Sequence, residues 1–109
     1  MTHYVKSENP ACRGLPIVGR KSLFLDDGLH DMAECAVFLE ASPRQHERSR
    51  QEIERLKGEI VERGHAHLPP LIIAEEDGQV QVLDGNHRVL ALWESGITHH
   101  PAVIVEKNI

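Results

Sequence analysis

Apolar residues recur at helical spacing in the middle of the chain. Ser42-Pro43 can start a helical turn, because proline is tolerated at the first helical position. Three apolar residues follow three or four positions apart: Ile53, Leu56 and Ile60. Gly64 then supplies a helix stop. The pattern predicts a long amphipathic helix that closes at residue 64.

After this helix the pattern changes to that of strands. Leu71 to Ala74 is an apolar run behind two prolines, which keep the preceding residues extended, and it predicts a buried strand. Glu76-Asp77-Gly78 is a turn signal that leads into a second strand at Val80 to Leu83. The two strands are therefore expected to form a β-hairpin.

A second helix is predicted directly after the hairpin, from about Asn86 to Ser95, with Gly96 as its stop. Three residues are expected on its core side: Val89, Leu92 and Trp93. Val103 to Val105 is the last predicted strand.

The first third of the chain carries weaker signals. Residues 1–13 have no periodicity and are expected to be loosely ordered. Leu15 to Val18 and Ser22 to Leu25 could pair as a hairpin, and Asp26-Asp27-Gly28 is a turn signal. Residues 35–39 fit a buried strand or the end of a helix that starts at Asp31. We predict a strand, because valine and phenylalanine favour sheets.

Length and composition indicate one small domain. A chain of 109 residues holds a single core, which we assign to residues 34–109, with residues 1–33 as an N-terminal extension. The net charge of −5 disfavours DNA as a partner, since non-specific affinity comes from neutralised phosphates. Two widely spaced cysteines do not form a disulfide framework, and Cys35 is interpreted as a small buried hydrophobe.

The sequence also bears on location and on metal binding. No apolar stretch approaches the ~20 residues that span a bilayer, and Met1 to Lys6 lacks the apolar core of a signal peptide, which predicts a cytoplasmic protein without a membrane partner. His65-x-His67 and His99-His100 could supply ligands, but no acidic or thiolate partner has matching spacing. Structural zinc is therefore disfavoured, and these histidines are expected to be solvated.

The junction between the last hairpin strand and the second predicted helix is the strongest candidate for chemistry. The first turn of a helix has unpaired N–H groups and a positive dipole end, so it binds anions. Gly85 permits close backbone approach and a positive φ. Arg88 offers a planar guanidinium that fits phosphate oxygens, and His87 can donate a hydrogen bond or move a proton. The alternative is an Asp/Asn turn that caps the helix, with Arg88 solvated.

Asp84-Gly85-Asn86-His87-Arg88, its helix and the Pro101 to Val105 strand resemble the signature end of the ParB/sulfiredoxin superfamily. The helix at 53–64 and the Pro-Pro strand at 68–73 are similar to the elements that precede that signature, so the resemblance spans about residues 36 to 106. The Asp-Gly-x-His-Arg form, with His46-Glu47 ahead of the helix, looks closest to the free-serine kinases. The resemblance implies nucleotide phosphates on residues 85 to 88 and a carboxylate of the His-Glu pair near the transferred phosphoryl group.

Asn86 departs from each branch of that superfamily. Sulfiredoxins have a cysteine at this position, plasmid-partition ParB proteins have the glutamate that serves CTP hydrolysis, and the kinases have a second histidine. Cysteine-dependent sulfinic acid reduction and ParB-type hydrolysis are therefore disfavoured, whereas nucleotide binding survives the change.

The expected protein is an α+β domain with a ParB/sulfiredoxin-like mixed sheet of about four to five strands packed by two main helices. Four residues are expected to bind the nucleotide phosphates (ATP/ADP or CTP, with Mg²⁺): Gly85, Asn86, His87 and Arg88. If the chain is a phosphotransferase acting on a small hydroxyl such as serine, Glu47 in the loop before the long helix would be the base, and His87 would assist. Asp84 would orient His87, hold Mg²⁺ or cap the turn. The alternative is a non-catalytic ParB-like DNA-associated or regulatory module.

Overall fold

The computed structural model describes residues 3–106. Its elements are β1 (His3–Tyr4), β2 (Pro16–Phe24), α1 (Asp27–Phe38), α2 (Pro43–Arg63), β3 (Leu71–Glu76), β4 (Gln79–Asp84), α3 (Asn86–Glu94) and β5 (His99–Val105). The strands form one sheet in the order β1-β2-β5-β3-β4, in which β3 and β5 are parallel and the other pairs antiparallel. The expected α+β class with a mixed sheet is therefore confirmed.

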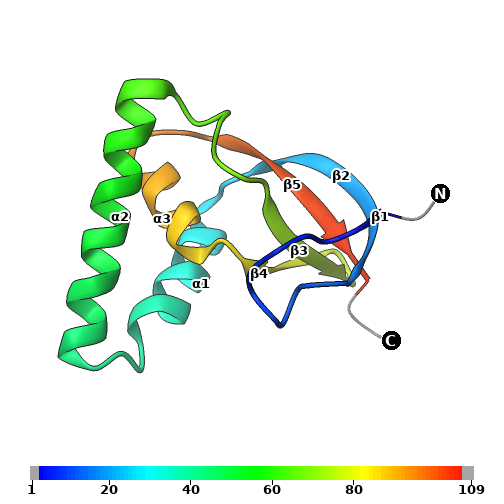
Figure 1. The fold of residues 1–109 in the computed structure, drawn as a ribbon, viewed down its shortest axis with the longest axis horizontal. Coiled ribbons are helices and arrows are strands. Elements are labelled where there is room, and N and C mark those ends of the chain that lie inside the picture. Colours follow the sequence, from blue (N-terminus) through cyan, green and yellow to red (C-terminus); the bar gives the residue numbers. More distant parts are fainter. Residues whose placement is uncertain (1–2, 107–109) are drawn as a thin grey trace.

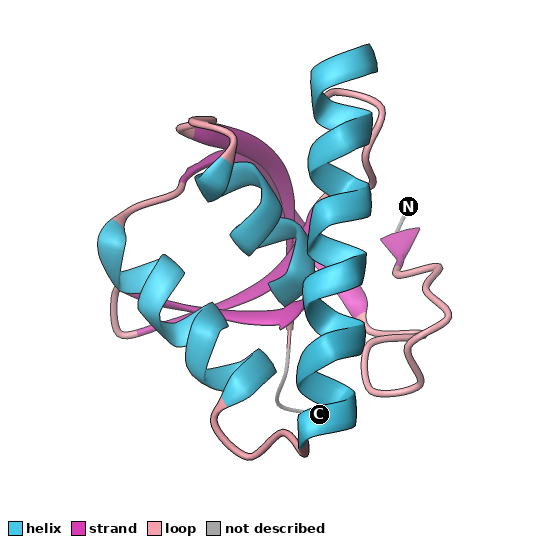
Figure 2. Cartoon of the chain, turned by 90° about the vertical axis from the view of Figure 1, so that its left-hand side faces the viewer, coloured by secondary structure: helices cyan, strands magenta, loops and turns pink. Residues whose placement is uncertain are grey.

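All three helices lie on one side of the curved sheet (Figure 1). Figure 2, seen from that side, shows α3 between α1 and α2, and α3 packs against both of them. Four consecutive residues of α3 are fully buried: Val89, Leu90, Ala91 and Leu92. A helix buried on this many sides has no solvated face in its middle, so its two ends are the parts open to ligands.

The long helix forms for the reasons that its sequence indicates. Ser42 caps α2 by accepting from the backbone N–H of Gln45, whose side chain reaches back to the Ser42 N–H. Ile53, Leu56 and Ile60 are buried, and Gly64, with φ of 77°, ends the helix. The prediction is confirmed, with one correction. The helix is continuous from Pro43, so Glu47 lies within it and not in a preceding loop.

β3 is covered on both faces of the sheet, which explains its unbroken apolar run. Leu71 and Ile73 belong to the core under the helices, whereas Ile72 packs on the opposite face. That second face is covered by the N-terminal segment, where Val5 and Cys12 are buried. The expectation of loose order is therefore wrong for residues 3–13. Residues 1–2 lie outside the described range.

Two further expectations in the first third are wrong. The pieces at 15–18 and 22–25 do not pair with each other, because β2 is one strand that runs along β5 from residue 17 to residue 24. Residues 35–38 are helical, since Asp26 caps α1 through the Leu29 N–H and both Leu29 and Ala33 are buried one turn apart. This orientation leaves Cys35 exposed, in contrast to its expected burial.

The second half of the chain follows the sequence pattern closely. The β3–β4 hairpin turns at Asp77-Gly78, both with positive φ, and α3 ends before Gly96, which has φ of 77°. Trp93 is only half-buried and lies against the ring of His30, with centroids 4.9 Å apart, so it borders the core and is not inside it. Within residues 3–106, no helix is long and apolar enough to cross a membrane.

Helix α2 provides a test of this packing. Ile53→Ala should lower the free energy of unfolding by about 2–5 kcal/mol, because Ile53 is fully buried between the helices and the sheet. Val61→Ala is the matched control on the same helix. Val61 is 83% exposed, so its truncation should change stability by less than about 0.5 kcal/mol. Urea denaturation measures both, and equal losses would contradict the assigned face of α2.

Candidate functional site

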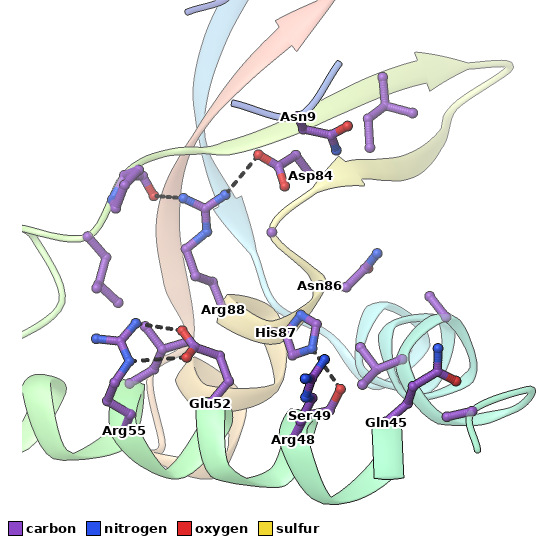
Figure 3. A pocket seen from close by; sticks show the side chains of 18 of the residues that line it. Asn9, Gln45, Arg48, Ser49, Glu52, Arg55, Asp84, Asn86, His87 and Arg88 are labelled. Carbon is purple, nitrogen blue, oxygen red and sulfur yellow. Dashed lines mark hydrogen bonds and ion pairs between the residues drawn. The ribbon is translucent and has the colours of Figure 1, made fainter. Parts of the chain in front are cut away.

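An open cleft of about 940 Å³ lies between the amino-terminal half of α2, the end of α1 and the turn that joins β4 to α3. Figure 3 shows Asn86, His87 and Arg88 at the beginning of α3, with His87 directed toward Ser49 of α2 and Arg88 directed toward Asp84. Cleft-lining residues of α2 recur at helical spacing: Gln45, Arg48, Ser49, Glu52, Arg55, Leu56 and Glu59. One polar stripe of a long helix therefore forms a wall opposite the candidate turn.

Gly85 is the residue that shapes the turn. Its φ of 114° is rarely adopted by other residues, and a Cβ there would lie 2.7 Å from Leu71 Cδ2 and 3.0 Å from Arg88 Nη2. Within α3 the first backbone hydrogen bond runs from the Val89 N–H to the Gly85 carbonyl, at 2.8 Å. No side chain caps this end, so the N–H groups of the first three helical residues have no acceptor within the helix. The positive φ expected at Gly85 is confirmed. Of the three roles left open for Asp84, capping of α3 by its side chain does not occur.

Arg88 is folded back across Gly85. Its side chain is only 14% exposed, and its guanidinium donates to the Pro69 carbonyl at 3.3 Å and pairs with Asp84 Oδ2 at 3.5 Å. Burial lowers the pKa of Arg88, while the Asp84 carboxylate opposes that shift. The Arg88 guanidinium is therefore neither solvated nor free to bind phosphate in this structure.

Asp84 and His87 point to different partners. Asp84 Oδ2 also accepts a hydrogen bond from Ser7 Oγ at 3.3 Å, which ties the turn to the N-terminal segment. His87 Nε2 lies 3.0 Å from Ser49 Oγ on α2. Among the contacts of the described residues, Asp84 thus orients Arg88 and does not orient His87.

The structure places the two candidate carboxylates of α2 differently. Glu47 is exposed and does not line the cleft, whereas Glu52 lines it and forms a two-point ion pair with Arg55. The hydrogen bond from Arg55 lowers the pKa of Glu52, and His87 acts in the same direction. Sequence reasoning missed Glu52. The signal that could have found it is the polar stripe of a helix that begins at Ser42.

Two histidines are also more buried than expected. His67 lines the cleft, and both of its ring nitrogens are buried without a hydrogen-bond partner in the described part of the chain. Such groups are rare in folded proteins, because an unpaired buried polar atom costs free energy. His100 on β5 is fully buried, which corrects the expectation that it is solvated.

Neither a protein-family model, nor a curated protein, nor a solved structure matched the chain. The resemblance to the ParB/sulfiredoxin superfamily therefore depends on the motif at residues 84–88 and the elements around it.

Glycine substitutions test the turn. Gly85→Ala and Gly96→Ala both place a methyl group on a residue with positive φ, at the two ends of α3. At Gly96 no atom lies within 4 Å of the added Cβ, so only backbone strain of about 1–2 kcal/mol is expected. Gly85→Ala should cost clearly more, because Leu71 and Arg88 must also move. Urea denaturation measures the free energy of unfolding of both variants. Equal losses would show that contact of the added methyl group with Leu71 and Arg88 costs no free energy.

Proposed function

We propose that the protein binds a nucleotide by its phosphates at the amino end of α3. The observation that carries the proposal is the uncapped first turn of this helix, which opens on a cleft of about 940 Å³. Backbone N–H groups and the positive dipole end favour phosphate there. The cleft volume is at the upper end of the ~300–1,000 Å³ that is typical of small-molecule sites.

Side chains around this turn add the charge that phosphate needs. Arg48 lines the cleft next to Ser49 on α2 and has no ion-pair partner among residues 3–106 (Figure 3). His67, with its unpartnered ring nitrogens, is a second independent polar group in the same cleft. Arg48, His87 and the α3 backbone are therefore the proposed phosphate ligands, and Asn86 is at hand for a further hydrogen bond.

Magnesium through Asp84, as expected from the sequence, fits less well. A divalent cation on this carboxylate would lie against the Arg88 guanidinium, which already neutralises it. Glu52 is similarly engaged by Arg55. Within the described residues, no group of three or more His, Cys, Asp or Glu is arranged to hold a metal ion. We therefore propose that the protein residues bind phosphate directly, without a bridging metal ion.

Phosphoryl transfer to a small hydroxyl such as serine is the second candidate, favoured by the Glu52 carboxylate beside His87 in the cleft. A general base works best with a pKa near the operating pH. The pKa of Glu52 is lowered instead, and Glu47 lies outside the cleft lining. Binding without catalysis, as in a regulatory module that senses a nucleotide, is thus better supported than a kinase. The net charge of −5 continues to disfavour DNA.

Arg48→Ala should weaken triphosphate binding, because a charge-assisted contact contributes about 1.5–3 kcal/mol. Arg44→Ala is the matched control, since Arg44 is an exposed arginine of the first turn of α2 that does not line the cleft. The measurement is a thermal-shift titration with ATP, ADP, CTP, GTP and tripolyphosphate. A saturating ligand at 100 times its dissociation constant should stabilise the parent by about 2.7 kcal/mol. No stabilisation by any of these compounds would refute the proposed function.

Phosphorus NMR of ATP with Mg²⁺ and a panel of hydroxyl acceptors separates binding from transfer. If transfer occurs with Glu52 as its base, Glu52→Gln should reduce turnover by ~10²–10⁴-fold at nearly unchanged affinity, while Glu47→Gln keeps parental turnover. The opposite pattern would return the catalytic role to Glu47. A nucleotide-stabilised protein that yields no new phosphorus signal would leave nucleotide binding as its function.

A further inference from the structure

His100 is the one polar or charged side chain that is fully buried in the described chain. Its Nε2 lies 3.2 Å from the Pro69 carbonyl oxygen, in the loop between α2 and β3. A carbonyl oxygen can only accept, so Nε2 must carry the hydrogen. The neutral ring therefore has its lone pair on Nδ1.

His65, from the same loop, completes this arrangement. Its Nδ1 lies 2.9 Å from Nδ1 of His100, with the two ring centroids 5.1 Å apart. Because His100 Nδ1 accepts, His65 Nδ1 must donate, and the tautomers of both rings follow from one carbonyl. Only one hydrogen fits between the two Nδ1 atoms, so two fully protonated rings could not keep this contact.

The Pro69 carbonyl oxygen also accepts from Arg88 Nη1, at 3.3 Å. One backbone atom thus connects the histidine pair to the guanidinium that crosses Gly85, and this guanidinium is held on its other side by Asp84 (Figure 3). Both lone pairs of the carbonyl are used, which fixes the direction in which the loop presents it.

We infer that His100 and His65 are positioning residues for Arg88: as a neutral pair they hold the Pro69 carbonyl in the orientation that keeps Arg88 folded over the amino end of α3. Through Arg88 the pair sets the shape and charge of the phosphate-binding turn. This effect on ligand affinity rests on the proposed function, whereas the effect on Arg88 does not.

The charged and titratable groups facing His100 in the described chain are His65 from the loop and Arg88 from α3, with Asp84 of β4 beyond Arg88. Burial is the largest cause that lowers the pKa of His100, and His65 and Arg88 act in the same direction. In the unfolded chain, the His100 ring takes up a proton near its ordinary pKa of 6.5. In the folded protein the pKa is lowered, so the ring takes up its proton only at a lower pH. Stability contributed by the neutral ring is therefore complete above pH 6.5 and is lost as the pH falls from there to the lowered value.

The test compares His100→Leu, His100→Gln and His99→Leu, the last being a control at the neighbouring exposed histidine of β5. Two quantities are measured: the NMR signal of the Arg88 Nε–H, assigned by its absence from Arg88→Lys, and the affinity for tripolyphosphate. His100→Leu should shift or broaden the Arg88 signal and weaken tripolyphosphate binding by about threefold to tenfold, as expected for one lost hydrogen bond. His100→Gln should restore both, because its NH₂ group can donate to the Pro69 carbonyl while its C=O oxygen accepts from His65. His99→Leu should change neither.

The pH dependence supplies an independent readout. His100→Gln should flatten the loss of stability of the parent below pH 6.5, measured by urea denaturation at several pH values. If His100→Leu does not fold, His65→Ala replaces it, because it removes the donor to His100 from a less buried position. An Arg88 signal that stays at its parental position in the folded variant overturns the inference. If the parent does not bind tripolyphosphate, the proposed function fails, and the Arg88 signal alone decides the positioning role.

Discussion

The burial of α3 against the sheet is the constraint on which the rest of the structure depends. Residues 89 to 92 are each 1% exposed or less, so this short helix is enclosed by α1, α2 and the strands beneath it. Such enclosure requires the chain to leave β4 and enter the helix almost without a connecting loop. Gly85 makes this possible, because it accepts a φ of 114° and has no Cβ, so its backbone packs directly against the Leu71 side chain. Close packing of the helix and exposure of its uncapped end to the cleft therefore have the same cause.

What the sequence predicted correctly depends on signals within a few residues of one another. The Ser42-Pro43 start and Gly64 stop of α2, the Asp77-Gly78 turn and the positive φ of Gly85 all follow from local backbone chemistry. The errors have two causes. β2 became one strand because β5 lies beside its whole length, a contact between segments tens of residues apart that no local pattern contains. At residues 35–38 the local helix signals, the Asp26 cap and the spacing of Leu29 and Ala33, are present in the sequence, but the prediction followed the strand propensity of valine and phenylalanine.

The candidate site was predicted in the same uneven way. The turn at residues 84–88 was found from its sequence, but the direction of each side chain depends on neighbours from elsewhere. Arg88 is drawn to the Pro69 carbonyl and to Asp84, and His87 is drawn to Ser49. Glu52, not Glu47, lines the cleft, because within the continuous helix α2 Glu52 lies on the same stripe as Arg48 and Glu47 does not. The motif at residues 84–88 therefore indicated a segment that borders the cleft, but not the directions of its side chains.

Hydrogen bonds around the turn join elements from both faces of the sheet. Ser7 of the N-terminal segment reaches Asp84, Asp84 holds Arg88, and Arg88 shares the Pro69 carbonyl with His100. Arg88 and His100 are largely shielded from water, where a polar contact is stronger and its loss is more costly. Replacing Arg88 would therefore change stability and ligand binding together, and its effect on either could not be assigned. Arg48 is exposed and has no such contact within residues 3–106, so the electrostatic contribution of the cleft can be measured there without disturbing the fold.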